Sequence, residues 1–231
     1  MFRAVNVRRS LELVGLVLGT RDFSDSHRIV DLLTPEEGRL SLLARGGRAS
    51  KRRFAGALDL FVTLRVQVST GGNLWTLTGA DVLDARVEIR KRLEALARAS
   101  LLAELTRALA PEHQAAPELF GVASEALDRL NRGEDSSAAA AYPALLSAAG
   151  VLPELRGCAR CGVDRAGALR EDGFVCTVCV PTRRPMSDAV RAVWQGAPCD
   201  SDALALAVED AALDFSEAAL GVRFKSRHLR L

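Results

Sequence analysis

The chain has 231 residues, of which 48% are hydrophobic and 26% are charged, a composition typical of a soluble globular protein that excludes a disordered or fibrous chain. Thirty-one basic and 29 acidic residues leave a formal net charge of +2, so the overall charge predicts neither nucleic-acid nor membrane binding. Aromatic residues make up only 5%, which disfavours a binding mode that depends on many stacked rings.

The sequence predicts a cytoplasmic protein without membrane contact. No apolar run approaches the roughly 18 to 20 residues that span a bilayer. The arginine-rich start is followed by an apolar stretch that Glu12 interrupts, and no small-residue cleavage site follows, so we expect no secretory signal. In a reducing compartment, paired cysteines more often bind metal than form disulfides.

The first eighty residues have the pattern of β-strands. Apolar side chains at every second position of residues 60–68 predict the clearest strand, with Phe61 as the exception on its polar face. The turn residues 71–73 connect it to a second strand over 74–83. Three shorter strands are predicted over 13–20, 28–34 and 39–45. Five short strands without a long helix between them predict a small closed barrel or sandwich.

From Asp84 the apolar spacing becomes helical. Residues 89–109 carry apolar side chains on two helix faces, which is typical of a helix inside a bundle. Four further helices are predicted around 120–130, 142–149, 187–194 and 204–219. The sequence therefore predicts an α+β protein, with a strand domain over 1–82 and a helical domain over 83–231.

Four cysteines form the strongest motif of the chain. Cys158 and Cys161 are separated by two residues, as are Cys176 and Cys179, and fourteen residues separate the two pairs. This spacing is typical of four thiolates that bind one structural Zn²⁺, with no coordination position left for a substrate. We predict a zinc finger over 156–182; metal-free thiols and a redox site are the alternatives. Cys199 has no partner in the sequence and is expected to fill apolar space.

Six arginines surround the cysteine pairs, and their role is open. They are Arg156, Arg160, Arg165, Arg170, Arg183 and Arg184. They could form a nucleic-acid surface, or they could offset the negative charge of four thiolates. Of the two interpretations, we favour charge compensation.

A basic segment follows the third predicted strand. Five cations occur in the nine residues 45–53, without an acid among them: Arg45, Arg48, Lys51, Arg52 and Arg53. Arg39 lies on the same strand face as Arg45, and Gly46 and Gly47 expose backbone that phosphates can approach. The segment predicts a nucleic-acid surface, with a merely solvated face as the alternative.

Few aromatic residues lie near the basic segment. Phe54 and Trp75 are the candidates for base stacking there, whereas Phe61 and Trp194 are expected to fill cores. Affinity for nucleic acid is therefore expected to come mainly from phosphates and to depend strongly on salt.

The C-terminal region separates acidic from basic residues. Residues 200–217 carry six acids and no base, whereas Arg223, Lys225, Arg227 and Arg230 lie in the last nine residues. An acidic helix is usually a solvated face, but it could also dock the basic tail of the chain or a basic partner.

Motifs of catalysis are missing from the sequence. It contains no Walker loop, no G-x-G-x-x-G, no G-x-S-x-G and no H-E-x-x-H. His27, His113 and His228 lie outside any metal or nucleophile motif and are expected at the surface or in hydrogen bonds. Enzymatic activity is therefore the disfavoured class.

The order of barrel, helices, cysteine insert and closing helices resembles the RecO recombination mediators of bacterial DNA repair. The matching segments are Thr34-x3-Gly38, Ala44-Arg45-Gly46-Gly47-Arg48, Lys51-Arg52-Arg53, Leu58-Asp59-Leu60-Phe61, Pro153-x4-Cys158-x2-Cys161-Gly162 and Lys225-Ser226-Arg227. Asp59 stands where the family more often has an uncharged residue, which affects a strand edge and not the chemistry.

The resemblance implies an N-terminal OB-fold and a function without bond chemistry. It implies binding of single- and double-stranded DNA, strand annealing and, together with RecR, loading of RecA onto strands coated by single-stranded DNA-binding protein. A nucleoid-associated location in the cytoplasm would follow. The residues expected to hold phosphates are Arg39, Arg45, Arg48, Lys51, Arg52 and Arg53.

Two other functions are compatible with the residues. The acidic helix and the large helical share would suit a zinc-stabilised protein-interaction adaptor with incidental nucleic-acid binding. A zinc hydrolase would need an open metal site, which four protein ligands do not provide.

Overall fold

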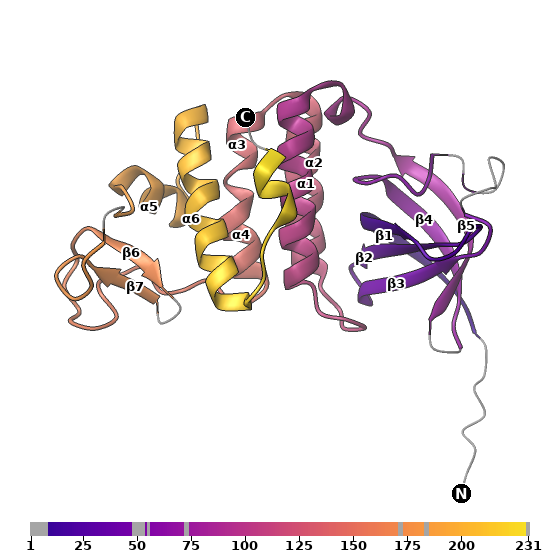
Figure 1. The fold of residues 1–231 in the computed structure, drawn as a ribbon, viewed down its shortest axis with the longest axis horizontal. Coiled ribbons are helices and arrows are strands. Elements are labelled where there is room, and N and C mark those ends of the chain that lie inside the picture. The colour runs from indigo at the N-terminus through magenta and orange to yellow at the C-terminus, as the bar shows by residue number, and fades with distance from the viewer. Residues whose placement is uncertain are drawn as a thin grey trace, which may run out of the picture.

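The structure is a computed structural model that describes residues 9–47, 54, 56–71, 74–170, 173–182 and 185–229. A closed five-stranded barrel forms one end of the molecule, helices form its middle, and a small hairpin lies at the other end (Figure 1). The barrel strands are β1 (Ser10–Asp22), β2 (Arg28–Thr34), β3 (Gly38–Ala44), β4 (Thr63–Ser69) and β5 (Trp75–Asp84). They are joined in the order β1-β2-β3-β5-β4, so the predicted barrel is confirmed.

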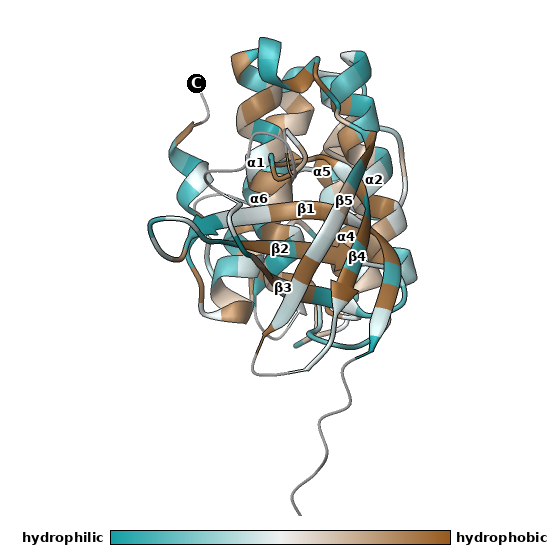
Figure 2. Cartoon of the chain, turned by 90° about the vertical axis from the view of Figure 1, so that its right-hand side faces the viewer, coloured by the Kyte–Doolittle hydropathy of each residue, from teal (hydrophilic) through white to brown (hydrophobic). Residues whose placement is uncertain are grey.

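Strand β4 has the predicted alternation, which Figure 2 shows as brown and teal segments. Arg65 and Gln67 are exposed on its outer face. The side chains that point into the barrel are Leu64, Val66 and Val68. The strand begins at Thr63 and not at residue 60, which corrects the predicted range. The reason is Phe61, whose φ of +70° interrupts the extended backbone.

Two hydrophobic cores meet at the barrel wall. The barrel interior packs residues such as Val17, Leu32 and Leu40 against one another. Neighbouring side chains on the outer face of β1 and β2 belong instead to the helical core, among them Leu16, Leu18 and Leu33. Because successive strand residues point to opposite faces, β1 and β2 are buried on both sides. The helices therefore cover the outer face of β1 and β2.

The helical part contains six α-helices and two short 3-10 helices in the described residues. They are η1 (Ile89–Lys91), α1 (Leu93–Leu109), α2 (Pro117–Arg132), α3 (Asp135–Ala138), α4 (Ala141–Ala148), α5 (Asp188–Trp194), α6 (Asp202–Leu220) and η2 (Lys225–Leu229). Within the described residues, no helix combines the length and the apolar character needed to cross a bilayer.

Serine and glycine residues define several helix ends. Ser187 caps α5 by accepting a hydrogen bond from Val190 N at 3.3 Å, and Ser201 begins α6 in the same way. Gly133 and Gly221 end α2 and α6 with φ values of +84° and +65°, a conformation that glycine adopts without strain.

The helix expected from Asp84 begins later than the sequence suggested. Strand β5 extends through Asp84, Arg86 adopts a φ of +41°, and the regular helix α1 starts at Leu93. The two-sided apolar pattern of α1 is explained by its position, because it lies between the barrel and the other helices (Figure 1).

The cysteine-bearing segment forms a two-stranded sheet between α4 and α5. Its strands are β6 (Gly167–Arg170) and β7 (Gly173–Cys176), which pair antiparallel. Phe174 of β7 is fully buried and belongs to the helical core, so the hairpin is anchored on the helices.

Candidate metal centre and nucleic-acid interface

The four predicted metal ligands converge on one point. The sulfur atoms of Cys158, Cys161, Cys176 and Cys179 all lie within 4.8 Å of one another. The Sγ atoms of Cys161 and Cys176 are 3.7 Å apart. A tetrahedral ion with bonds of about 2.3 Å would separate its sulfur ligands by about 3.8 Å, so these thiols fit such an ion.

Backbone geometry prepares the first cysteine pair for a negative charge. Gly157 has a φ of +79°, and a Cβ there would lie 2.7 Å from Gly162 O, so the tight turn requires glycine. The backbone N–H groups of Cys176 and Arg160 donate to Cys158 Sγ at 3.3 and 3.4 Å. These bonds, led by that of Cys176, lower the pKa of the Cys158 thiol to about 6. Cys158 is therefore predisposed to be a thiolate ligand.

Arg191 of α5 fixes the cysteine module (residues 156–182) to the helical domain. Its guanidinium lies 4.8 Å from the centre of the Phe174 ring and donates to Leu155 O at 2.7 Å. It also pairs with Asp164. One half-buried arginine thus joins three parts of the chain, so the module has a fixed orientation on the helices.

Arginines cover the outside of the cysteine module. Arg156, Arg160, Arg165 and Arg170 are exposed, and Arg183 and Arg184 lie outside the described residues. The module lies at the end of the molecule opposite the barrel (Figure 1). Cys199 is buried as expected, with 3% of its surface exposed.

Arg39 lies at the junction of barrel and helices. Its Nη2 atom is 2.7 Å from Glu112 Oε1, and its Nε donates to Ala110 O at 3.4 Å. Its backbone N–H donates to Pro111 O at 2.8 Å. The strand 2–3 face that binds oligonucleotides in many OB-folds is thus partly covered here by helices and by the α1–α2 loop.

Arg45 lies at the other end of β3. Its side chain is exposed, and the following Gly46 has a φ of +70° with open space where a Cβ would be. Arg28 pairs with Ala44 at this end, whereas Thr34 pairs with Gly38 beside the α1–α2 loop. The basic segment therefore leaves the barrel at the end of β3 that faces away from that loop. Arg48, Lys51, Arg52 and Arg53 lie outside the described residues.

Of the two candidates for base stacking, Phe54 is excluded by its position in the structure. Phe54 is 4% exposed and packs in the barrel core, so its ring is inaccessible to a base. Trp75 is half-buried, and its ring contacts that of His113 at 5.1 Å between centroids. Phe61 and Trp194 fill cores, as predicted.

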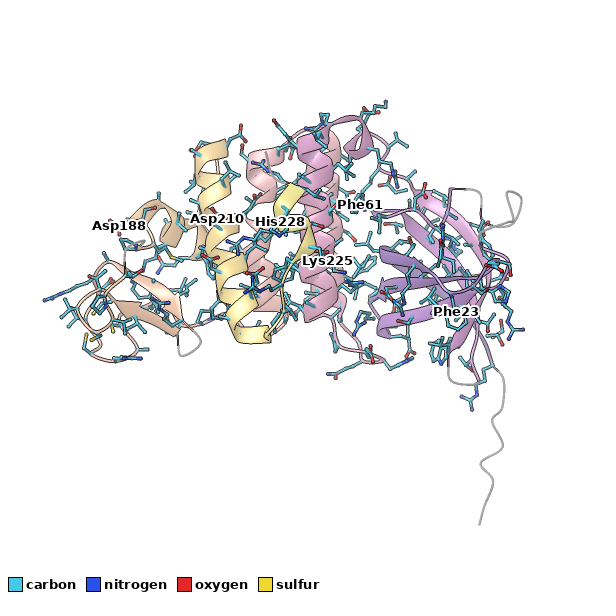
Figure 3. All side chains as sticks on the ribbon, viewed as in Figure 1. Phe23, Phe61, Asp188, Asp210, Lys225 and His228 are labelled. Atoms are coloured by element: carbon cyan, nitrogen blue, oxygen red, sulfur yellow. The ribbon has the colours of Figure 1, made fainter. Side chains whose placement is uncertain are left out.

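Sequence reasoning missed Phe23, which is 58% exposed in the β1–β2 turn. It is 22 positions from Arg45 in the chain. Only the pairing of β1, β2 and β3 brings the β1–β2 turn and the turn over residues 45–47 to the same end of the barrel. A sequence signal did exist, because Asp22, Ser24, Asp25 and Ser26 mark a polar turn in which an apolar ring has no core to enter. Figure 3 labels Phe23 on the barrel.

The β1–β2 turn is joined to the start of the basic segment. Gly46 N donates to His27 Nδ1 at 3.3 Å, and Ser26 Oγ lies 3.0 Å from the same nitrogen. His27 therefore has the hydrogen-bonding role expected from the sequence. The β1–β2 turn and residues 45–47 are thus in direct contact at this end of the barrel.

The acidic helix α6 docks the basic tail of the chain, one of the possibilities considered for it. Arg227 lies 2.6 Å from Asp214 Oδ1, 2.9 Å from Glu217 Oε2 and 3.8 Å from Asp210 Oδ1. Arg227 thus neutralises part of the negative charge of α6 within the chain.

Comparison with known families assigns the two halves of the chain. The family model described as "Recombination protein O N terminal" matches residues 9–86, and the model "Recombination protein O C terminal" matches residues 90–195. The chain belongs to the RecO family. The resemblance found in the sequence is thereby confirmed, and so is the OB-fold character of its barrel.

Curated RecO relatives agree with this assignment. The protein named DNA repair protein RecO from Anaeromyxobacter sp. (strain K) is 40% identical over 180 residues, covering 74% of this chain and 71% of the relative. Its namesake from Myxococcus xanthus (strain DK1622) is 40% identical over 171 residues, covering 71% and 70%. That from Bacillus pumilus (strain SAFR-032) is 32% identical over 185 residues, covering 76% and 72%. Membership of the RecO family supports a role in DNA repair and recombination.

Proposed function

We propose that this chain is a recombinational DNA repair mediator that binds single- and double-stranded DNA without sequence specificity and promotes strand annealing. The observation that carries the proposal is the exposed end of β3, where Arg45 and Gly46 begin a segment with five cations in nine residues. Phosphates attract such a segment regardless of base sequence. In this proposal the protein catalyses no bond chemistry.

The proposed phosphate contacts are unequal in strength. Arg45, Arg48, Lys51, Arg52 and Arg53 supply most of the attraction. Arg39 contributes less, because Glu112 already offsets its charge at 2.7 Å. Among the domains, we propose the OB-fold over 1–82 as the DNA-binding unit, and the helical domain over 83–231 as the scaffold that carries the zinc finger 156–182.

The metal of the cysteine module is proposed to be one structural Zn²⁺. Four thiol ligands with this spacing suit zinc, and four protein ligands leave no position for a substrate. The ion would stabilise a segment whose buried cluster holds little beyond the cysteines themselves.

The family suggests the partners of such a mediator. We propose that, with RecR, the chain helps to load RecA onto strands coated by single-stranded DNA-binding protein, in the cytoplasm and at the nucleoid. The helical domain is the proposed surface for protein partners.

The proposal is tested by binding of oligonucleotides to the full chain. Replacing Arg48, Lys51, Arg52 and Arg53 with Ala should weaken binding of single- and double-stranded oligonucleotides of any sequence. Unchanged affinity would refute it. Capture of RecR that persists after nuclease treatment, combined with unchanged DNA affinity in this variant, would favour the protein-interaction adaptor instead.

A further inference from the structure

Phe23 is a large apolar side chain that the fold does not bury. Among the Phe, Trp and Tyr side chains that the structure describes, it alone is exposed, with 58% of its surface accessible. Burying a phenylalanine stabilises a protein by roughly 1.5 to 3 kcal/mol, so its exposure forgoes a sizeable contribution to folding. Phe61, also labelled in Figure 3, shows the ordinary alternative, because it lies where the barrel meets the helices and is 1% exposed in their core.

The turn that carries Phe23 is held by local hydrogen bonds. Phe23 N and Ser24 N both donate to His27 O, at 3.0 and 3.4 Å, and His27 N donates to Ser24 Oγ at 3.2 Å. At the base of the turn, Arg28 Nε donates to Asp22 Oδ1 at 3.2 Å. The ring is therefore presented from an ordered turn, which reduces the entropy lost when it binds a ligand.

Phe23 lies beside the proposed phosphate contacts. Asp22 of β1 pairs with Arg28 of β2, and Arg28 pairs with Ala44 of β3, so these three residues form one row across the sheet. Phe23 and Arg45 each come directly after an end of this row. Two strand spacings of about 4.8 Å place their backbones roughly 10 Å apart. The bond from Gly46 N to His27 Nδ1 fixes the two turns relative to each other.

This pairing of groups matches single-stranded nucleic acid. A groove or edge of positive charge holds the backbone, and an aromatic ring stacks on a base, which every base permits because each has a π-face. Bases inside a duplex are already stacked on one another and are inaccessible to a side chain at the edge of the barrel.

We propose that Phe23 stacks on an unpaired base of single-stranded DNA whose neighbouring phosphate is held by Arg45, at the start of the basic segment. This inference rests on the proposed function and adds to it a residue that distinguishes single strands from duplexes. It also places this single-strand contact in the β1–β2 turn and not on the strand face that the helices cover.

The test compares three variants of the full chain: Phe23→Ala, Phe23→Trp and Leu93→Ala. Leu93 is a matched control, because it is 59% exposed at the start of α1 and belongs to the helical part of the chain. Affinity is measured for an oligonucleotide as a single strand and as a duplex, each at several salt concentrations. Tryptophan fluorescence is recorded for Phe23→Trp and for the unmodified chain.

Phe23→Ala should weaken single-strand binding by about 5-fold to 150-fold, the range for loss of one base–aromatic stack. Duplex affinity and the salt dependence should stay unchanged, since no phosphate contact is lost. Phe23→Trp should bind single strands as tightly as the unmodified chain does. The fluorescence of its additional tryptophan should be quenched by single strands and not by duplexes. Leu93→Ala should behave as the unmodified chain.

Three results would overturn the inference while leaving the proposed function intact. They are unchanged single-strand affinity in Phe23→Ala, equal weakening for both DNA forms, and unquenched fluorescence of a DNA-bound Phe23→Trp variant. Loss of self-association or of protein binding with unchanged DNA affinity would assign Phe23 to a protein contact and also overturn it. If the unmodified chain bound no DNA at low salt, the proposed function itself would fail.

Discussion

Arg39 Nη2 lies 2.7 Å from Glu112 Oε1, so a strand of the barrel is joined by an ion pair to the loop between α1 and α2. The pair uses a cation that the sequence assigned to phosphate binding. The α1–α2 loop therefore contacts the OB-fold at β3. The carboxylate of Glu112 partly neutralises the positive charge of Arg39 at this junction.

Arg39→Ala should therefore weaken DNA binding less than Arg45→Ala does. The pair is partly exposed, so its loss should lower the free energy of unfolding by only about 0 to 1 kcal/mol. Oligonucleotide titration and urea unfolding of both variants measure the two effects. An equal loss of DNA affinity in the two variants would contradict this reading of Arg39.

Arg86 is a buried connection between the barrel and α2. Its side chain is 3% exposed and donates to Asp128 Oδ1 at 2.6 Å, to Phe61 O at 2.8 Å and to Thr63 Oγ1 at 2.8 Å. Arg86→Ala should lower the free energy of unfolding by about 3 to 5 kcal/mol, because it leaves these partners without their donor. Chemical denaturation measures the change.

A matched surface pair provides the control for Arg86. Arg132 Nε lies 2.8 Å from Glu134 Oε1 with both side chains exposed, and its guanidinium keeps the pKa of the Glu134 carboxyl below the ordinary value. Arg132→Ala should change stability little, since water screens the pair. Similar losses in Arg86→Ala and Arg132→Ala would show that burial of Arg86 contributes nothing.

Gly38 and Gly46 test how tightly the α1–α2 loop covers β3. Both have positive φ, +60° and +70°. A Cβ at Gly38 would lie 2.1 Å from Gln114 O and 2.6 Å from Pro111 O, whereas a Cβ at Gly46 has open space. Gly46→Ala should cost only the backbone strain, about 1 to 2 kcal/mol, and Gly38→Ala clearly more.

Thermal or urea unfolding of the two glycine variants compares the costs directly. Because the Gly38 clash involves backbone atoms of the loop, no side-chain rotation relieves it, and the loop must shift away from the barrel. Equal stabilities of the two variants would mean that the loop does not pack on β3 as described.

The sequence predicted those parts of the fold that depend on residues close together in the chain, and failed where distant residues decide the structure. The alternation in β4 and the helical spacing of α2 and α6 depend on neighbouring residues, and these predictions are confirmed. The start of α1 was predicted too early, because the positive φ of Arg86 is stabilised by contacts with β4 and α2 that no local pattern contains.

The candidate site was predictable to a similar extent. The cysteine spacing is a local signal, and the four sulfurs do converge. The prediction for Phe54 is wrong and Phe23 was missed because burial depends on where a loop packs: Phe54 turns into the barrel, whereas Phe23 lies beyond the end of β1 with no core to enter. Proximity to Arg45 along the chain was a poor guide to proximity in space.

Metal content gives an independent test of the cysteine module. The purified chain should contain one equivalent of zinc, measured by elemental analysis, and Cys158→Ser combined with Cys176→Ser should remove it. Cys199→Ser is the matched control, because Cys199 is buried outside the cluster and should leave the metal in place. Metal retained by the double variant, or absent from the unmodified protein, would contradict the assignment.

Phosphates, and not base edges, are expected to supply most of the affinity for DNA. The most direct measurement is the affinity of the full chain for a single-stranded oligonucleotide across a salt series, with and without Ala at Arg45, Arg48, Lys51, Arg52 and Arg53. Each single-strand phosphate contact contributes a slope of about −0.7 in log affinity against log salt, so removal of five should flatten the slope by up to roughly 3.5. A slope that stays the same in the variant, or no complex even at low salt, would contradict the account.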